Sequence, residues 1–195
     1  MNIMKSYLIK NHKLWQKSYS APNVENVIFR LQGRILKKQY KLPKKNKLTT
    51  MLDFGCGQGA TVNFFNQCGY DAYGVDISEI DIEIAKVRYP QIAHKFFVCK
   101  PDVFKVPMTK FTENKKISLI TGQQSLYYFD KEDFFTLLKN FKNSLETKGL
   151  LFASMMSTSH TYYKYSKKTK FKWLRKTNFS GKRLKFKDYY NFHCS

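Results

Sequence analysis

Three glycines and one carboxylate lie at spacings that suit a nucleotide. Gly55, Gly57 and Gly59 follow the apolar segment TMLDF and precede a helix-length stretch that starts at Ala60. Missing Cβ atoms let a ligand approach the backbone, and N–H groups at a helix start can donate to it. Asp76 ends the next apolar segment, about 20 residues on, where a carboxylate can bond ribose hydroxyls. These residues predict a binding loop for a nucleotide-like ligand.

The glycine pattern alone does not identify the cofactor. With Ala60 they also match the G-x-G-x-x-A fingerprint of dinucleotide-binding proteins, so an NAD-dependent oxidoreductase is one alternative. Asp53 places a negative charge shortly before Gly55, where it would repel a pyrophosphate and attract a cationic amino acid group. The charge therefore favours a sulfonium nucleoside over a dinucleotide.

Alternating strands and helices must position this loop. Apolar residues at helical spacing predict an amphipathic helix over residues 23–40, ahead of the loop, as a lid. Strand and helix patterns then alternate, which predicts an α/β fold with a Rossmann-like, doubly wound, mostly parallel sheet. The expected strands are TMLDF, AYGVD, 95–99, 117–121 and 150–156, and the expected helices are 60–68, 78–88 and 131–145.

The net charge of +21 divides the chain into three segments. Residues 1–47 carry 12 Lys and Arg against Glu25 alone, and residues 161–195 carry 11 against Asp188. Residues 48–160 carry 12 of each sign. We therefore expect a basic helical lid (1–47), a cofactor-binding core (48–160) and a basic, aromatic, irregular C-terminal segment (161–195). The basic ends suit an anionic partner, although codon bias of an AT-rich genome explains the lysines equally well.

Composition and cysteine spacing exclude several classes of protein. A chain of 195 residues suits one domain. The longest apolar run, 149–156, is far shorter than a membrane span, and the N-terminus lacks a signal-like stretch. We therefore expect a cytoplasmic protein without integral membrane association. The four cysteines show no metal-ligand spacing, so we expect neither a metal nor a disulfide framework.

The motifs LDFGCGQG and YGVDIS closely resemble the first two cofactor motifs of class I S-adenosylmethionine-dependent methyltransferases. The resemblance implies a seven-stranded Rossmann-like sheet, S-adenosyl-L-methionine as cofactor and S-adenosyl-L-homocysteine as product. It places Asp76 on the ribose diol and Ile77 beside the adenine, with Asp53 anchoring the methionine end through the loop or a water. Loop residues would surround the amino acid part: Gly55, Cys56, Gly57 and Gly59.

Two further segments extend the resemblance. CKPDVFKVP is similar to the family's third motif, which implies that Asp102 and Val103 meet the adenine. LWQKSYSAPNVENVIFR is similar to the lead-in of small-molecule and surface-glycan methyltransferases, which implies that Tyr19 closes over the site and Arg30 pairs with the cofactor carboxylate. Gln123, after the fourth expected strand, completes the predicted cofactor site.

The resemblance weakens after residue 156. The family usually adds a helix and two antiparallel strands after the fifth strand, whereas residues 157–195 look shorter and more irregular. We therefore expect this part of the fold to be truncated or formed from unusual sequence.

Methyl transfer from a sulfonium needs positioning more than acid or base catalysis, because the leaving group is already activated. Positioning can supply about 7–11 kcal/mol. His160 and Tyr127 are the candidate catalytic residues, since a histidine can accept a proton near neutral pH. The alternatives are a solvated His160 and a Tyr127 that packs inward.

The acceptor is expected to be a small polar molecule, anionic through a phosphate or linked to a sugar. This expectation rests on the lead-in resemblance and on the basic ends. RNA is the second choice, because aromatic residues interleave with lysines in HTYYKYSKKTKFKWLRK and could stack bases. A noncatalytic nucleic-acid-binding protein on the same fold is a further alternative.

Overall fold

A parallel sheet of five strands forms the centre of the computed structural model, which describes residues 24–100, 102–170, 174–180 and 185–192. The strand order is β3-β2-β1-β4-β5, and every neighbouring pair is parallel. The direction of winding reverses between β1 and β4, which is where α/β sheets bind ligands. The strands are β1 (Thr50–Phe54), β2 (Asp71–Asp76), β3 (Phe96–Val98), β4 (Ile117–Gln123) and β5 (Leu145–Ser154).

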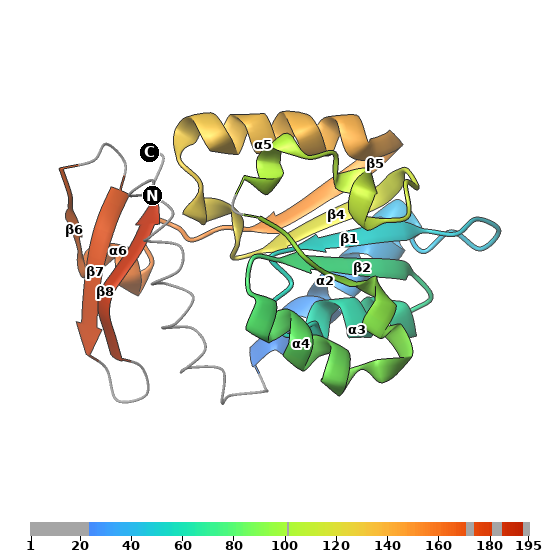
Figure 1. The fold of residues 1–195 in the computed structure, drawn as a ribbon, viewed down its shortest axis with the longest axis horizontal. Coiled ribbons are helices and arrows are strands. Elements are labelled where there is room, and N and C mark those ends of the chain that lie inside the picture. The colour runs from blue at the N-terminus through green and yellow to red at the C-terminus, as the bar shows by residue number, and fades with distance from the viewer. Residues whose placement is uncertain (1–23, 101, 171–173, 181–184, 193–195) are drawn as a thin grey trace.

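Helices cover both faces of this sheet. α5 lies over one face, and α3 and α4 lie over the other, with α2 beside α3 (Figure 1). This arrangement confirms the predicted doubly wound α/β fold and the helix ahead of the loop. The helices are α2 (Val24–Tyr40), α3 (Ala60–Gln67), α4 (Glu79–Arg88) and α5 (Lys131–Ser144).

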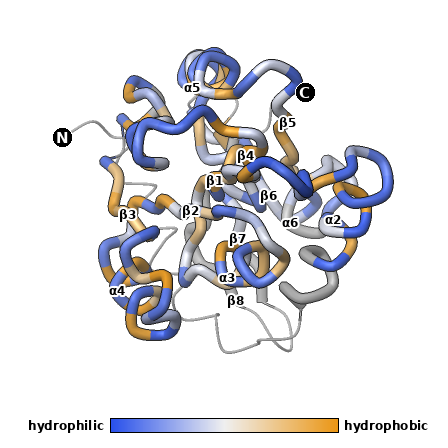
Figure 2. The backbone as a smooth tube through the Cα atoms, turned by 90° about the vertical axis from the view of Figure 1, so that its right-hand side faces the viewer, coloured by the Kyte–Doolittle hydropathy of each residue, from blue (hydrophilic) through white to orange (hydrophobic). Residues whose placement is uncertain are grey.

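The core consists of two apolar layers on either side of β1 and β4. All five residues of β1 and six of the seven in β4 are buried. Hydrophobic residues gather on the central strands, whereas hydrophilic ones lie along the outer helices and connections (Figure 2). Met51 and Leu52 sit in opposite layers, because successive strand residues point to opposite faces. The sheet thus fixes the ends of β1 and β4, and with them the glycine loop.

The fifth strand differs from its prediction. The sequence predicts a helix over 131–145 and a strand over 150–156, but β5 begins at Leu145 and runs through Gly149. Its register against β4 jumps from Ile117–Leu145 to Leu119–Leu150, so the intervening residues form an irregularity within the strand. A Cβ on Gly149 would lie 3.0 Å from the carbonyl oxygen of Ile117, which is why a glycine fits there.

The C-terminal segment is ordered into a second sheet, and the expectation of irregular structure there was wrong. After α6 (Thr161–Lys164) come β6 (Ser166–Lys168), β7 (Leu174–Ser180) and β8 (Lys185–Phe192), paired antiparallel in that order. Few apolar residues alternate in these strands, so the usual strand pattern is missing from the sequence. The seven-stranded sheet that the resemblance implies is also not formed by the described residues, because these strands pair apart from the main sheet.

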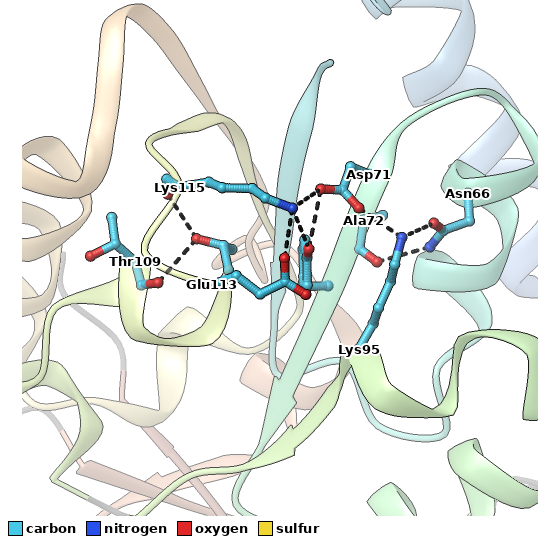
Figure 3. A network of polar contacts seen from close by, with 9 residues as sticks. Asn66, Asp71, Ala72, Lys95, Thr109, Glu113 and Lys115 are labelled. Atoms are coloured by element: carbon cyan, nitrogen blue, oxygen red, sulfur yellow. Dashed lines mark hydrogen bonds and ion pairs between the residues drawn. The ribbon is translucent and has the colours of Figure 1, made fainter.

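A polar cluster holds the start of β2, at the end of the strand remote from the glycine loop. The Asp71 carboxylate accepts hydrogen bonds from Lys95 Nζ at 2.7 Å and from Lys115 Nζ at 3.1 Å (Figure 3). Lys115 also pairs with Glu113 at 2.8 Å, and Lys95 donates to Asn66. The cluster ties β2 to the segments that lead into β3 and β4, which fixes the register of three strands.

Among the residues that the structure describes, no helix is both long and apolar enough to cross a membrane.

Candidate active site

The glycine loop connects β1 to α3 at the carboxyl edge of the sheet. Gly55 has a φ of 76° and Gly59 a φ of 81°, in the left-handed region that favours glycine. A Cβ on Gly55 would lie 2.5 Å from the Cβ of Ser125, and one on Gly59 would lie 2.6 Å from the ring of Phe96. The loop therefore needs glycine for its backbone and for its close packing.

Two loop amides fasten this turn to the neighbouring strand. The N–H groups of Gly55 and Cys56 both donate to the carbonyl of Val75, at 2.9 and 3.0 Å. Gly74 lies close to the side chain of Cys56, and a Cβ there would meet the Cys56 sulfur at 2.8 Å. In the second motif, YGVDIS, Gly74 therefore leaves room for the Cys56 side chain of the first motif, and Val75 holds the loop backbone through its carbonyl.

Asp76 bridges the two motifs directly. One carboxylate oxygen accepts from the N–H of Gly57 at 2.8 Å, and the other accepts from the N–H of Ser78 at 2.9 Å. Ser78 in turn caps α4, because its hydroxyl accepts from the N–H of Asp81 at 3.1 Å. A carboxylate offers about four acceptor positions. Asp76 is partly exposed, so it can hold the loop and still accept the hydroxyls of a ribose.

Asp53 lies beneath the loop and not on its surface. It is 1% exposed, and its carboxylate accepts from the hydroxyl of Thr121 at 2.6 Å. The two residues stand opposite each other in the β1–β4 register. Direct contact with a ligand is therefore closed to Asp53 in this conformation, and its charge would act through the loop.

Gln123 belongs to a polar chain that the sequence did not reveal. Its amide Nε2 donates to Oε1 of Gln32 on α2, and its Oε1 accepts from the hydroxyl of Ser154 at the end of β5, at 2.8 Å. Because Gln123 lies two residues beyond Thr121, which pairs with Asp53, it stands at the level of Gly55. These hydrogen bonds therefore join α2 to two strand ends beside the loop.

Gln32 carries a polar atom that has no hydrogen-bond partner among the described residues. The side chain is fully buried, and its Nε2 finds no acceptor. A buried donor left unpaired costs about 1–3 kcal/mol. Because Gln32 is fully buried, as Asp53 is, direct contact with a ligand is closed to this amide in this conformation. No sequence motif marks Gln32, since its role depends on the packing of α2.

The loop thiol is not poised for chemistry. Burial, followed by the nearby charges of Asp76 and Asp53, raises the pKa of Cys56 well above its ordinary value. Burial likewise raises the pKa of Cys99 to about 12. Both side chains are buried within the hydrophobic core. They act as small apolar residues.

The remaining predicted cofactor residues fall in different surroundings. Ile77 is partly buried and packs against the core layer that also contains Val103, which is 2% exposed. Asp102 is partly exposed, one residue before the short 3-10 helix Val103–Lys105. Arg30 is exposed on α2. Tyr19 lies outside the described residues.

The predicted catalytic residues lie beyond the ends of β4 and β5. Tyr127 is 4% exposed, and its ring centre lies 4.6 Å from that of the partly exposed Tyr128. His160 is exposed just before α6, where its carbonyl accepts from the N–H of Tyr163. Strand β8 contacts the short 3-10 helix Leu126–Tyr128 that follows β4, and the second sheet faces this edge of the molecule (Figure 1). The fold thus brings the C-terminal sheet beside the candidate site.

A parallel sheet with a glycine loop at its switch point, and an acid at the end of the next strand, defines a nucleoside-binding α/β domain. A family model described as a methyltransferase domain matches residues 28–190 of the chain. The chain therefore belongs to this methyltransferase domain family, which confirms the family predicted from the sequence.

One curated relative and several solved structures are similar to the chain. Over 112 residues it is 27% identical to the mRNA cap guanine-N(7) methyltransferase of Schizosaccharomyces pombe, covering 54% of this chain and 31% of that protein. The chain thus spans about a third of the relative's length. The PH0226 protein from Pyrococcus horikoshii has a TM-score of 0.55 at 20% identity, covering 70% of this chain and 59% of that one.

Two further structures share the fold. The SAM-bound amino pentose methyltransferase CalS10 from Micromonospora echinaspora has a TM-score of 0.53 at 13% identity, covering 75% of this chain and 56% of that one. A TehB-like SAM-dependent methyltransferase from Corynebacterium glutamicum has a TM-score of 0.51 at 19% identity, covering 76% and 70%. At these identities the likeness concerns the fold.

Proposed function

We propose that the chain transfers a methyl group from S-adenosyl-L-methionine to an acceptor and releases S-adenosyl-L-homocysteine. The bond from Gly57 to Asp76 carries this proposal, because it joins a glycine loop to a ribose-binding carboxylate at the switch point of the sheet. Membership in the methyltransferase domain family supports it. When bound, the cofactor supplies the activated methyl group, and the chain supplies its position.

The predicted cofactor residues take defined roles in this proposal. The loop from Gly55 to Gly59 surrounds the amino acid part, and Asp76 accepts the ribose hydroxyls. Ile77, Asp102 and Val103 form the adenine side. Gln123, which is partly exposed, faces polar groups at the methionine end. The lid would contribute Tyr19 and Arg30, and the segments 1–47, 48–160 and 161–195 act as lid, core and acceptor side.

The acceptor we favour is a small polar molecule that is phosphorylated or linked to a sugar. The basic C-terminal sheet beside the carboxyl edge supports an anionic acceptor. A neighbour in fold, CalS10, is described as an amino pentose methyltransferase. In this proposal His160 accepts the proton of the acceptor where one must leave, and Tyr127 shapes the acceptor pocket from within.

RNA is the second candidate acceptor. The partial similarity to an mRNA cap guanine-N(7) methyltransferase favours it, and so does the density of lysines after residue 160. An RNA acceptor would make binding depend steeply on salt, because each phosphate contact releases counterions.

Two measurements test the proposed function. Titration calorimetry with S-adenosylhomocysteine and with NADH distinguishes a methyltransferase from an oxidoreductase. We expect S-adenosylhomocysteine to bind and NADH not to bind. A tritiated-methyl assay over separated small-molecule and RNA fractions of a cell extract then identifies the acceptor class. Binding of NADH alone, or absence of methyl transfer to every fraction despite cofactor binding, would contradict the proposal.

A further inference from the structure

A buried amide on α2 holds the side chain that ends β4. Oε1 of Gln32 accepts from Nε2 of Gln123, whereas Nε2 of Gln32 has no partner among the described residues. A buried donor without a partner destabilises a fold, and an apolar side chain of similar size, such as methionine, would carry no such donor. The packing of α2 alone therefore does not explain a glutamine at this fully buried position.

The amide of Gln123 is oriented from two sides. Its Nε2 donates to Gln32, and its Oε1 accepts from the Ser154 hydroxyl at 2.8 Å. A glutamine side chain carries two N–H donors, so one N–H of Gln123 remains after these contacts. Gln123 is the last residue of β4 and is partly exposed at the carboxyl edge of the sheet. The two contacts thus leave one oriented donor for a ligand at this edge.

The residues that follow Gln123 pack this strand end against the glycine loop. A Cβ on Gly55 would lie 2.5 Å from the Cβ of Ser125. Between Gln123 and Ser125, Gln124 has a φ of 54°, and its N–H donates to the hydroxyl and the carbonyl of Ser154 at 3.0 and 3.1 Å. A residue other than glycine is strained in this left-handed region, and such strain gathers at functional sites. Ser154 therefore holds both the strained backbone and the Gln123 amide beside the predicted cofactor loop.

We propose that Gln32 is a positioning residue of the cofactor site. It acts through Gln123, because by accepting one N–H of that amide it keeps the other N–H in place for the carboxylate at the methionine end of the cofactor. A hydrogen bond to a charged acceptor is stronger than one between neutral groups, and a donor ordered before binding costs less to immobilise. This inference rests on the proposed methyl transfer and extends the set of residues that control cofactor affinity to α2.

The substitution Gln32→Met separates this role from a structural one. Methionine fills a similar volume and removes the unpaired donor, and water can reach the partly exposed Gln123, so the melting temperature should stay the same or rise. Affinity for S-adenosylhomocysteine should nevertheless fall about threefold or more, because only a fraction of the molecules would then hold the Gln123 amide in the binding arrangement. Gln39→Met makes the same change at an exposed position of α2 and should alter neither quantity.

A second substitution tests whether Gln32 acts through Gln123. Gln123→Met removes the donor itself, so affinity for S-adenosylhomocysteine should fall about tenfold or more. In the double variant, Gln32→Met should add no further loss, because the effects of residues that act as one unit are not additive. Gln123 is partly exposed, so its substitution tests the inference even if Gln32→Met does not fold.

The experiment is titration calorimetry of the full chain and these variants with S-adenosylhomocysteine and with 5′-methylthioadenosine, which lacks the amino acid part. We expect the substitutions at Gln32 and Gln123 to weaken binding of S-adenosylhomocysteine and to leave that of 5′-methylthioadenosine unchanged. Unchanged affinity of either single variant for S-adenosylhomocysteine would overturn the inference. So would an equal loss for both nucleosides, or a further loss in the double variant. Failure of S-adenosylhomocysteine to bind the unaltered chain would instead contradict the proposed function.

Discussion

The Asp76 carboxylate accepts a hydrogen bond from the Gly57 amide at 2.8 Å, and this bond joins the two motifs of the candidate site. The same side chain accepts from Ser78, so it also fixes the start of α4. A residue predicted to hold ribose thus serves the architecture of its own loop. Its substitution should therefore alter both binding and stability.

Asp76→Asn tests the double role of this carboxylate. The amide can accept at one end only, so one backbone N–H loses its partner, and stability should fall by about 1–3 kcal/mol. Calorimetry at a temperature where the variant remains folded should show weaker binding of S-adenosylhomocysteine. Glu83→Gln, an exposed carboxylate on α4, is the control. Unchanged cofactor affinity in the Asp76 variant would remove its assigned ribose contact.

Gly59→Ala should destabilise the protein by about 2–4 kcal/mol, because the left-handed backbone and the crowding against Phe96 both oppose a side chain. Gly33→Ala is the matched control. Its Cβ would meet Phe64 at an ordinary 3.5 Å inside α2, so it should stabilise the helix by about 0.5–1 kcal/mol. Urea unfolding measures both. Equal effects of the two substitutions would show that the loop tolerates a side chain.

Glu146 should make stability depend on pH in the acid range. Burial alone would raise the pKa of Glu146. The hydrogen bonds from Lys44 and Lys47 outweigh this effect and lower the pKa to about 2. A lowered folded pKa stabilises the protein above the unfolded value of about 4.3, and this contribution disappears as the pH falls toward 2. Thermal melting of Glu146→Gln between pH 2 and 5 should show a shallower rise in stability with pH. Glu132→Gln, at an exposed position on α5, should leave the pH dependence of stability unchanged. If stability depended on pH equally in both variants, Glu146 would not have this role.

The buried cysteines should resist alkylation. Burial raises the pKa of all three thiols that the structure describes, but the side chains of Cys56 and Cys99 are buried whereas that of Cys68 is exposed. The thiolate is the reactive form, so iodoacetamide at pH 7.5 should modify Cys68 well before it modifies Cys56 and Cys99 in the folded chain. Mass spectrometry of peptides from the native and urea-unfolded protein measures this order. Rapid native modification of Cys56 would show that the loop opens to solvent.

The sequence alone determined the parts of the molecule that depend on local pattern. The order of strands and helices from Thr50 to Ser144 could be predicted from hydrophobic periodicity. The binding loop could be predicted from its closely spaced glycines, which a tight turn between a strand and a helix requires. Asp53 and Asp76 could be singled out because their positions relative to that loop are fixed by the strands that carry them.

Only the tertiary structure decided the contacts between distant segments. Gln32 and Gln123 lie 91 residues apart and meet because α2 packs over the end of β4. The C-terminal strands escaped prediction because few apolar residues alternate along their sequence. Lys167 and Lys176 stand opposite each other only through the register of β6 and β7, which neither strand's own sequence marks.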